Sequence, residues 1–223
     1  MIKQRPAETD PKVQAAAEEL VLAANTHQPS KFLTCSIRPS GIMGEGDRMA
    51  TLGLLRVYES GRANLQVGGN DNLFDFTYVE NVAHGHLLAA QALLMTYEAS
   101  TAPLDHEKVD GEAFFITNDT PVYFWDFART VWRAAGSPLK RNQMRVLPRE
   151  VGLALGFLSE IFFGIIGKPA TFNRQRIIYS CMTRYYDISK AKRRLGYKPL
   201  VPLEEGINRS VKWFLEHEDE WKN

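Results

Sequence analysis

The sequence predicts a protein of the α/β class, in which strands alternate with helices. Segments with apolar residues at every third or fourth position, typical of helices, alternate with short apolar or alternating segments, typical of strands. Hydrophobic residues make up 44% of the 223 residues, which is enough to build a core. No internal repeat or low-complexity tract interrupts this alternation.

Three helices and one clear strand are expected in the first half of the chain. Residues 11–25 form a helix with Asp10 as its N-cap and with one buried apolar face. Residues 32–38 form a strand that Pro39 ends, and residues 41–47 form a Gly-rich loop before a helix over 48–60. Residues 74–79 enter a long helix that reaches about residue 95. Because this helix is apolar nearly all round, we expect it to be central.

The second half begins with a polar linker over 98–110 and a strand over 112–117. The run Asp119-Thr120-Pro121 predicts the cap of a helix that Gly136 closes. The tail contains two short helices, over 189–195 and from Pro202 to about Glu216. The run 151–167 is hydrophobic except at Ser159 and Glu160.

Charge and composition exclude several classes of protein. The 27 basic and 26 acidic residues nearly balance, so no electrostatic field favours nucleic acid. Cys35 and Cys181 cannot make a disulfide framework or a four-thiolate zinc site, and a reducing compartment is expected. His84 and His86 lie two apart on a helix and face different directions, so no metal site is predicted. Residues 1–10 contain no apolar core of a secretion signal.

The run Gly41-Ile42-Met43-Gly44-Glu45-Gly46 follows a strand and precedes a helix, as a dinucleotide-binding fingerprint does. Its charges argue against that interpretation. Glu45 and Asp47 would place two carboxylates where the helix N-terminus should receive a pyrophosphate, and like charges repel.

Several strings in a consistent order carry a resemblance to a known family. They are RPSGIMGEGD at 38–47, DFTYVENVA at 75–83 and YDISKAKRRLGYKP at 186–199, with further agreement at 17–22 and 203–207. Together they resemble the 3β-hydroxysteroid dehydrogenase family of extended short-chain dehydrogenases/reductases. Within this family, the likeness is greatest to the sterol-4-alpha-carboxylate 3-dehydrogenases (decarboxylating), and it covers nearly the whole chain.

The resemblance implies that the family's front segment, which holds the dinucleotide, lies outside this sequence. It also implies a catalytic Tyr-x-x-x-Lys pair. Aligned on Ala17 and Glu18, the tyrosine position falls on Asp10 and the lysine position on Gln14. The family's tyrosine has a pKa of roughly 10 that positive charge must lower, and neither residue here can perform that chemistry. No catalytic residue is assigned, and this chain alone is expected to be inactive.

Six residues are carried over from the family's motifs. Pro39, Ser40, Gly41 and Ile42 match the loop that meets the nicotinamide of NAD or NADP, although a plain strand-ending turn explains them equally well. Two further residues, Asp75 and Tyr78, match a segment on the substrate side, and the alternative for Tyr78 is an aromatic ring packed under the long helix. Phe74 stands where nucleotide-sugar relatives tend to carry an arginine, which favours an apolar substrate.

The resemblance implies the C-terminal part of a Rossmann-type parallel sheet together with a mostly helical substrate lobe. The first part covers residues 1–97. The second covers residues 98–223, with 111–117 returning to the sheet. The implied function is the oxidation of the 3β-hydroxyl group of a steroid or 4-carboxysterol with NAD or NADP, coupled to decarboxylation, in sterol biosynthesis. A homo-oligomer is compatible with this family.

The run 151–167 suggests contact with a membrane surface. Its 17 residues fall short of the roughly 20 that span a bilayer, and Arg149, Lys168, Arg174 and Arg176 flank it. This composition is typical of a helix lying in the interface, although a helix of the substrate lobe would look similar. The expected location is the endoplasmic reticulum membrane surface or the cytoplasm.

Three alternatives stay open. One is a nucleotide-sugar epimerase or dihydroflavonol-type reductase of the same superfamily. Another is a non-catalytic sterol-binding or scaffolding protein, favoured by the missing Tyr/Lys pair. The third is a gene model that lacks the front domain.

Overall fold

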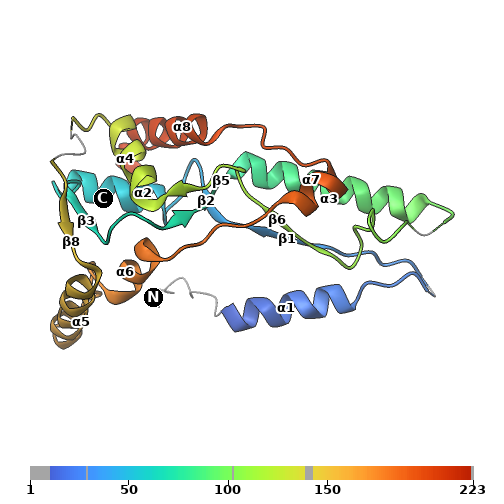
Figure 1. The fold of residues 1–223 in the computed structure, drawn as a ribbon, viewed down its shortest axis with the longest axis horizontal. Helices are drawn as coiled ribbons and strands as arrows, with labels where there is room; N and C mark the ends of the chain where they lie inside the picture. The colour runs from blue at the N-terminus through green and yellow to red at the C-terminus, as the bar shows by residue number, and fades with distance from the viewer. Residues whose placement is uncertain (1–10, 29, 102, 139–142, 222–223) are drawn as a thin grey trace. The chain divides into compact units, whose positions relative to one another are not determined.

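A computed structural model describes residues 11–28, 30–101, 103–138 and 143–221. Its helices, drawn in Figure 1, are α1 (Pro11–Ala23), α2 (Thr51–Glu59), α3 (Val79–Glu98), α4 (Phe124–Ala134), α5 (Arg149–Ile165), α6 (Arg174–Cys181), α7 (Ser189–Leu195), α8 (Leu203–Glu216) and α9 (Glu218–Trp221). Its strands are β1 (Ser36–Pro39), β2 (Gly41–Met43), β3 (Leu65–Val67), β4 (Leu73–Phe74), β5 (Phe76–Tyr78), β6 (Ala113–Ile116), β7 (Val122–Tyr123) and β8 (Arg145–Leu147).

Within the described residues the strands pair two by two. The pairs β2–β5 and β3–β8 are parallel, and β4–β7 is antiparallel. The fourth pair joins β1 to β6, the strand predicted at 112–117. Parallel pairs joined through helices confirm the α/β class that the alternating pattern predicted.

The chain forms two compact units. Unit 1 consists of residues 1–38, 83–116 and 187–198, and unit 2 consists of 39–82, 117–186 and 199–223. Each unit therefore gathers segments that are far apart in the sequence. The predicted division into 1–97 and 98–223 follows the chain order instead and stays a prediction.

Unit 2 has an aromatic core. Phe74, Phe76 and Tyr78 of β4 and β5 are fully buried, and the rings of Phe76 and Phe127 stack with centroids 3.5 Å apart. Helix α4 buries Phe124, Phe127, Ala128 and Val131 in this core. Helix α8 supplies Ile207, Val211 and Phe214 to the same core.

Unit 1 has a smaller core around β6. Phe114 and Ile116 are fully buried there, and α7 adds Ala191 and Leu195. Helix α7 ends as predicted, since Gly196 takes a left-handed conformation with φ 65°. Lys190 and Arg194 of the same helix form ion pairs with Glu112.

Two predicted faces are wrong. The apolar residues of α1 are exposed, with Leu20 at 73%, because no described element of unit 1 covers them. Helix α3 is not buried all round: Ala89 is buried, whereas Leu87, Leu94 and Met95 are mostly exposed. Apolar content indicates that a helix can be buried, but only a packing partner determines which side is covered.

Several boundaries also differ from the prediction. The first residues of the Gly-rich loop, Gly41–Met43, form β2 because they pair with β5. Asp119 does not cap α4, since β7 intervenes and the N-cap position belongs to Tyr123, which makes no side-chain cap. The sequence did not predict the strands β3, β4, β7 and β8 or the helices α6 and α9. In the part of the chain that the structure describes, no helix is long and apolar enough to cross a membrane.

Candidate functional site

The pairing of β2 with β5 brings together the two segments that carry the predicted site residues. Gly41 lies opposite Phe76, and Ile42 lies opposite Thr77. A Cβ atom on Gly41 would stand 3.3 Å from the ring of Phe74, so glycine allows the two strands to approach there. Gly41 and Ile42 of the predicted nicotinamide loop therefore lie beside the predicted substrate-side segment.

Ser40 and Ile42 have different surroundings within this loop. Ser40 is buried, and its hydroxyl donates a hydrogen bond of 2.7 Å to the backbone oxygen of Asp75. Its side chain therefore holds the two segments together. Ile42 is 45% exposed, and Pro39 is half-buried. Of the four residues, Ile42 presents the largest exposed apolar surface.

Asp75 carries its carboxyl group into the interior. Its Oδ2 accepts a hydrogen bond of 2.8 Å from the backbone N–H of Tyr186, and its Oδ1 is buried without a hydrogen-bond partner among the described residues. Burial raises the pKa of Asp75, which the Tyr186 bond partly offsets, and the charge of Asp119 adds to the rise. The geometry gives Asp75 a structural contact and does not test its predicted place on the substrate side.

Tyr78 is fully buried and keeps its hydroxyl proton. The hydroxyl donates to Glu45 with an O–O distance of 2.7 Å. Burial, together with this bond, raises the pKa of Tyr78 to about 12. The ring packs against α8, where a Cβ atom on Gly206 would come within 2.9 Å of it. At neutral pH this residue is therefore a hydrogen-bond donor and not a base.

A buried network of amides fixes the start of α3, and sequence reasoning missed it. The Oδ1 of Asn81 accepts from the backbone N–H groups of Leu200 and Val201, and its Nδ2 donates to Val201 and to Asn118. Asn118 in turn accepts from the backbone N–H of Tyr78 at 2.9 Å. The sequence did contain a signal for this network. Asn81 is an amide in the first turn of an apolar helix, and a buried amide needs hydrogen-bond partners.

The acidic residues of the loop after β2 are already hydrogen-bonded to neighbouring groups of the protein. Asp47 accepts hydrogen bonds from the backbone N–H groups of Met49, Ala50 and Thr51, the last at 2.7 Å. These groups at the start of α2 are the ones a diphosphate would need. Asp47 already satisfies them, and its negative charge would repel a phosphate.

The fit to NAD(P) is consequently limited to one end of the cofactor. Exposed Ile42 and the backbone of Gly41 fit contact with a flat nicotinamide ring. The described loop residues offer no cradle for the diphosphate, because Glu45 is bound to Tyr78 and Asp47 to α2.

Phe74 does not line a surface. It is fully buried and packs on Phe76, Phe124 and Tyr179, with the guanidinium of Arg184 6.0 Å above its ring. Its side chain is therefore part of the core, and the preference for an apolar substrate, which rests on the lack of an arginine at this position, stays a prediction.

Gln14, His84 and His86 are not among the residues that this site brings together. Asp10 lies outside the described residues, and Gln14 is an exposed residue of α1. His84 lies near the ring of Tyr197, with centroids 6.0 Å apart. Among the described residues, no group of three or more His, Cys, Asp or Glu side chains could hold a metal ion.

Comparisons with known proteins match the chain over most of its length. The model of the 3-beta hydroxysteroid dehydrogenase/isomerase family matches residues 1–149. The chain is 45% identical over 215 residues to the sterol-4-alpha-carboxylate 3-dehydrogenase, decarboxylating, of Saccharomyces cerevisiae, covering 96% of this chain and 59% of that protein. It is 34% identical over 202 residues to the mouse protein of the same description, covering 88% of this chain and 52% of the relative. The chain thus spans little more than half the length of these relatives.

Two solved structures share the fold at low sequence identity. One is the structure of gox2253, with a TM-score of 0.59 and 21% identity over 92% of this chain and 55% of that one. The other is a dTDP-glucose 4,6-dehydratase from Streptomyces venezuelae with NAD bound, with a TM-score of 0.59 and 14% identity over 95% of this chain and 52% of that one. These similarities support the Rossmann-type fold alone.

Proposed function

Because this chain belongs to the 3-beta hydroxysteroid dehydrogenase/isomerase family, we propose that it serves the oxidation of the 3β-hydroxyl group of a 4-carboxysterol, coupled to decarboxylation. The observation that carries the proposal is the 45% identity over 215 residues to a sterol-4-alpha-carboxylate 3-dehydrogenase. The proposed process is sterol biosynthesis.

The chemistry of the proposed substrate explains why the two reactions belong together. NAD or NADP would supply the acceptor for the hydride of C3, with Gly41 and Ile42 as the residues that would hold its nicotinamide end, and the hydroxyl group would lose its proton. The product is a β-keto acid at the 4-carboxylate. Its ketone can accept the electron pair released when the bond to the carboxylate breaks and CO2 leaves.

The contribution of this chain's own residues is to position the ligands. Ile42 and Gly41 of β2 are the proposed contacts for the nicotinamide end, and β5 with Tyr78 is the proposed substrate side. The hydrogen bond from the Ser40 hydroxyl to the backbone oxygen of Asp75 holds the start of β2 next to the start of β5. Tyr78 keeps its proton and donates a hydrogen bond to Glu45, so this residue cannot remove a proton from a ligand.

Ligand-dependent thermal stability tests the substrate class. The chain would be melted with a 4-carboxysterol supplied in cyclodextrin, and separately with UDP-glucose. A ligand that binds the folded state raises the melting temperature. We expect a rise with the sterol acid and none with UDP-glucose, and the reverse result would favour a nucleotide-sugar enzyme.

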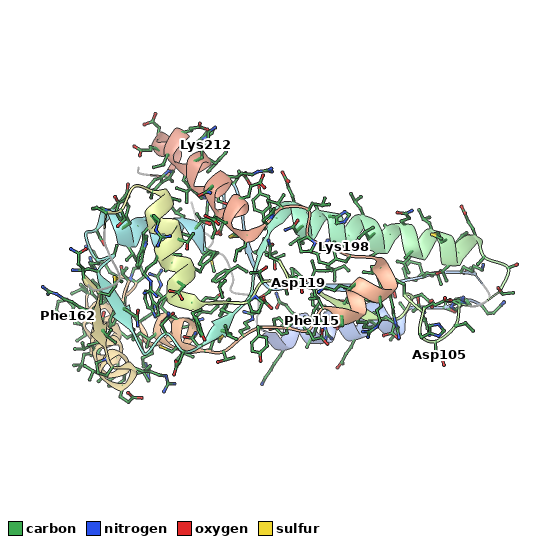
Figure 2. All side chains as sticks on the ribbon, turned by 45° about the horizontal axis from the view of Figure 1, so that its top comes forward. Asp105, Phe115, Asp119, Phe162, Lys198 and Lys212 are labelled. Atoms are coloured by element: carbon green, nitrogen blue, oxygen red, sulfur yellow. The ribbon has the colours of Figure 1, made fainter. Side chains whose placement is uncertain are left out.

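We also propose that α5 touches a membrane surface without crossing it. Five apolar residues of α5 recur at steps of three and four and are 45–81% exposed: Val151, Leu155, Leu158, Phe162 and Ile165. Glu160, the acidic residue that interrupts the run, is bound by Arg174 through its guanidinium and its backbone N–H. Figure 2 labels Phe162 on this helix. The proposed location is the surface of the endoplasmic reticulum.

Co-sedimentation with phospholipid vesicles tests this contact. Replacing Phe162 and Phe163 with Ser removes apolar area from α5, so less protein should pellet with the vesicles. The matched control is Leu94→Ser with Met95→Ser on α3, two residues that are 63% and 64% exposed. Equal pelleting of wild type and the α5 variant would rule out the membrane contact.

A further inference from the structure

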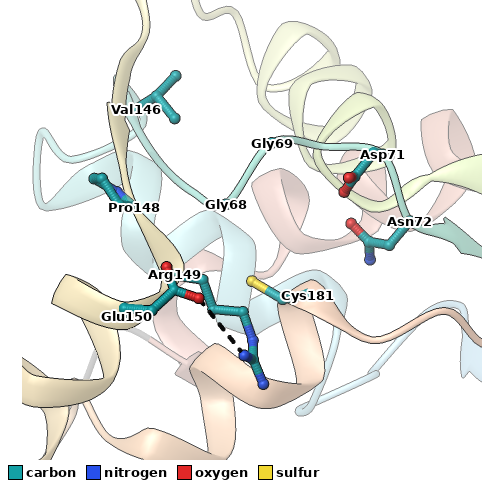
Figure 3. A pocket seen from close by; sticks show the side chains of 9 residues that line it. All are labelled: Gly68, Gly69, Asp71, Asn72, Val146, Pro148, Arg149, Glu150 and Cys181. Carbon is teal, nitrogen blue, oxygen red and sulfur yellow. Dashed lines mark ion pairs between the residues drawn. The ribbon is translucent and has the colours of Figure 1, made fainter.

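A pocket of about 340 Å³ lies at the start of α5, entirely within unit 2. The turn after β3, the junction of β8 with α5 and the end of α6 form its walls (Figure 3). Gly68 allows these walls to meet: its φ is 78°, and a Cβ atom there would stand 2.9 Å from the sulfur of Cys181. Asn72 ties the wall to α6 by donating to the backbone oxygens of Ser180 and Met182.

Groups of both charges line this pocket. Arg149 is the cation, and its guanidinium lies 3.9 Å from the carboxylate of Glu150. Asp71 adds a second carboxylate from the opposite wall. A diphosphate or a single carboxylate would meet two like charges here. A ligand that carries a phosphate next to an ammonium group can pair with Arg149 and with the carboxylates at the same time.

The rim of the pocket continues into the apolar stripe of α5. Arg149 and Glu150 form the first turn of this helix, and the stripe begins at the next residue, Val151. Residues at steps of three and four lie on one face of a helix, so the stripe runs from the pocket along α5 to Ile165. A molecule bound there would therefore have its polar end in the pocket and apolar surroundings beside it.

We propose that this pocket binds the zwitterionic headgroup of a membrane phospholipid, such as phosphocholine or phosphoethanolamine. The phosphate pairs with Arg149, and the ammonium group pairs with Asp71 and Glu150. The membrane as its source rests on the proposed contact of α5 with a lipid surface. The pocket itself rests only on the geometry of unit 2.

Calorimetric titration with glycerophosphocholine, which carries the headgroup without acyl chains, tests the pocket apart from the membrane. We expect the wild type to bind it and Arg149→Gln to bind at least tenfold more weakly. The matched control, Arg133→Gln, loses the same charge from an exposed position on α4 and should bind within twofold of wild type. Absence of binding to the wild type, or equal binding by Arg149→Gln, would overturn the proposal.

Co-sedimentation with phosphatidylcholine vesicles tests the source of the headgroup. The wild type should pellet, and Arg149→Gln should pellet several-fold less. If the wild type pellets and Arg149→Gln pellets equally, the membrane is not the source of the headgroup and the contact of α5 stands. If glycerophosphocholine binds but the wild type stays in solution with every vesicle, the membrane source and the contact of α5 are both wrong. Asp71→Asn, on the other wall, provides a second variant if Arg149→Gln fails to fold.

Discussion

Burial raises the proton affinity of the Asp75 carboxyl group. Its pKa lies above the ordinary value of 3.8 because the group is withdrawn from water. The folded protein therefore binds this proton more tightly than the unfolded chain does. Since a raised pKa favours the protonated folded state, the stability that this group contributes falls as the pH rises from the unfolded pKa through the folded one.

Replacing Asp75 with Asn removes this titration but keeps an acceptor for the N–H of Tyr186. We expect the advantage in unfolding free energy of wild type over Asp75→Asn to shrink between about pH 4 and pH 7. Urea denaturation at both values measures it, with Asp71→Asn as a control for a carboxylate on the wall of a pocket. A difference that grows with pH would contradict the raised pKa.

Asn81 makes four hydrogen bonds with its side chain, two as acceptor and two as donor. Replacing it with Ala would leave the part-buried N–H of Leu200 and the buried N–H of Val201 without their acceptor, and Asn118 would lose one of its two donors. Because each unsatisfied buried group costs roughly 1–3 kcal/mol, we expect a loss of about 3–5 kcal/mol in unfolding free energy.

Chemical denaturation followed by circular dichroism measures this loss. Gln91→Ala, an exposed amide on the same helix, serves as the control and should change stability by no more than about 0.5 kcal/mol. A loss below about 1 kcal/mol for Asn81→Ala would show that water replaces the network.

At the start of helix α2, Asp47 matters both for the charge there and for the hydrogen bonds of the helix. From the sequence, Asp47 argued against a pyrophosphate at the start of this helix because of its charge. In the structure Asp47 is itself the anion that binds the free N–H groups there. The charge argument therefore agrees with the geometry, and the hydrogen bonds supply its physical basis.

Replacing Asp47 with Ala should destabilise α2. Loss of a side-chain cap costs about 0.5–2 kcal/mol, and the favourable charge at the helix N-terminus is lost as well. We expect a loss of about 1–2 kcal/mol by denaturation. Asp47→Asn keeps an acceptor and should lose less, and equal stability of Asp47→Ala and wild type would contradict the capping.

For the whole molecule, the central question is whether this chain performs the proposed reaction without help. The positions that match the family's tyrosine and lysine carry Asp10 and Gln14. Asp cannot replace a phenol as the group that takes the hydroxyl proton, and Gln has no charge to lower a neighbour's pKa.

We therefore expect no turnover of a 3β-hydroxysteroid by this polypeptide with NAD or NADP. The measurement is the absorbance of the reduced nicotinamide, with the Saccharomyces cerevisiae relative as the positive control. Cofactor-dependent growth of that absorbance would show that residues other than the family pair carry the chemistry. This result is separate from ligand binding, which the melting experiment measures.

The sequence by itself determined the fold class, the family and the positions of most helices. Periodicity placed α4, α7 and α8 because helix propensity and glycine conformation are local, and Gly196 ends α7 where its left-handed backbone requires it. Tertiary structure alone decided the partners of the site residues. Ser40 donates to the Asp75 backbone, and Asn81 binds residues 200 and 201, because strand pairing and packing bring distant segments together. These contacts depend on the path of the whole chain, which no local pattern contains.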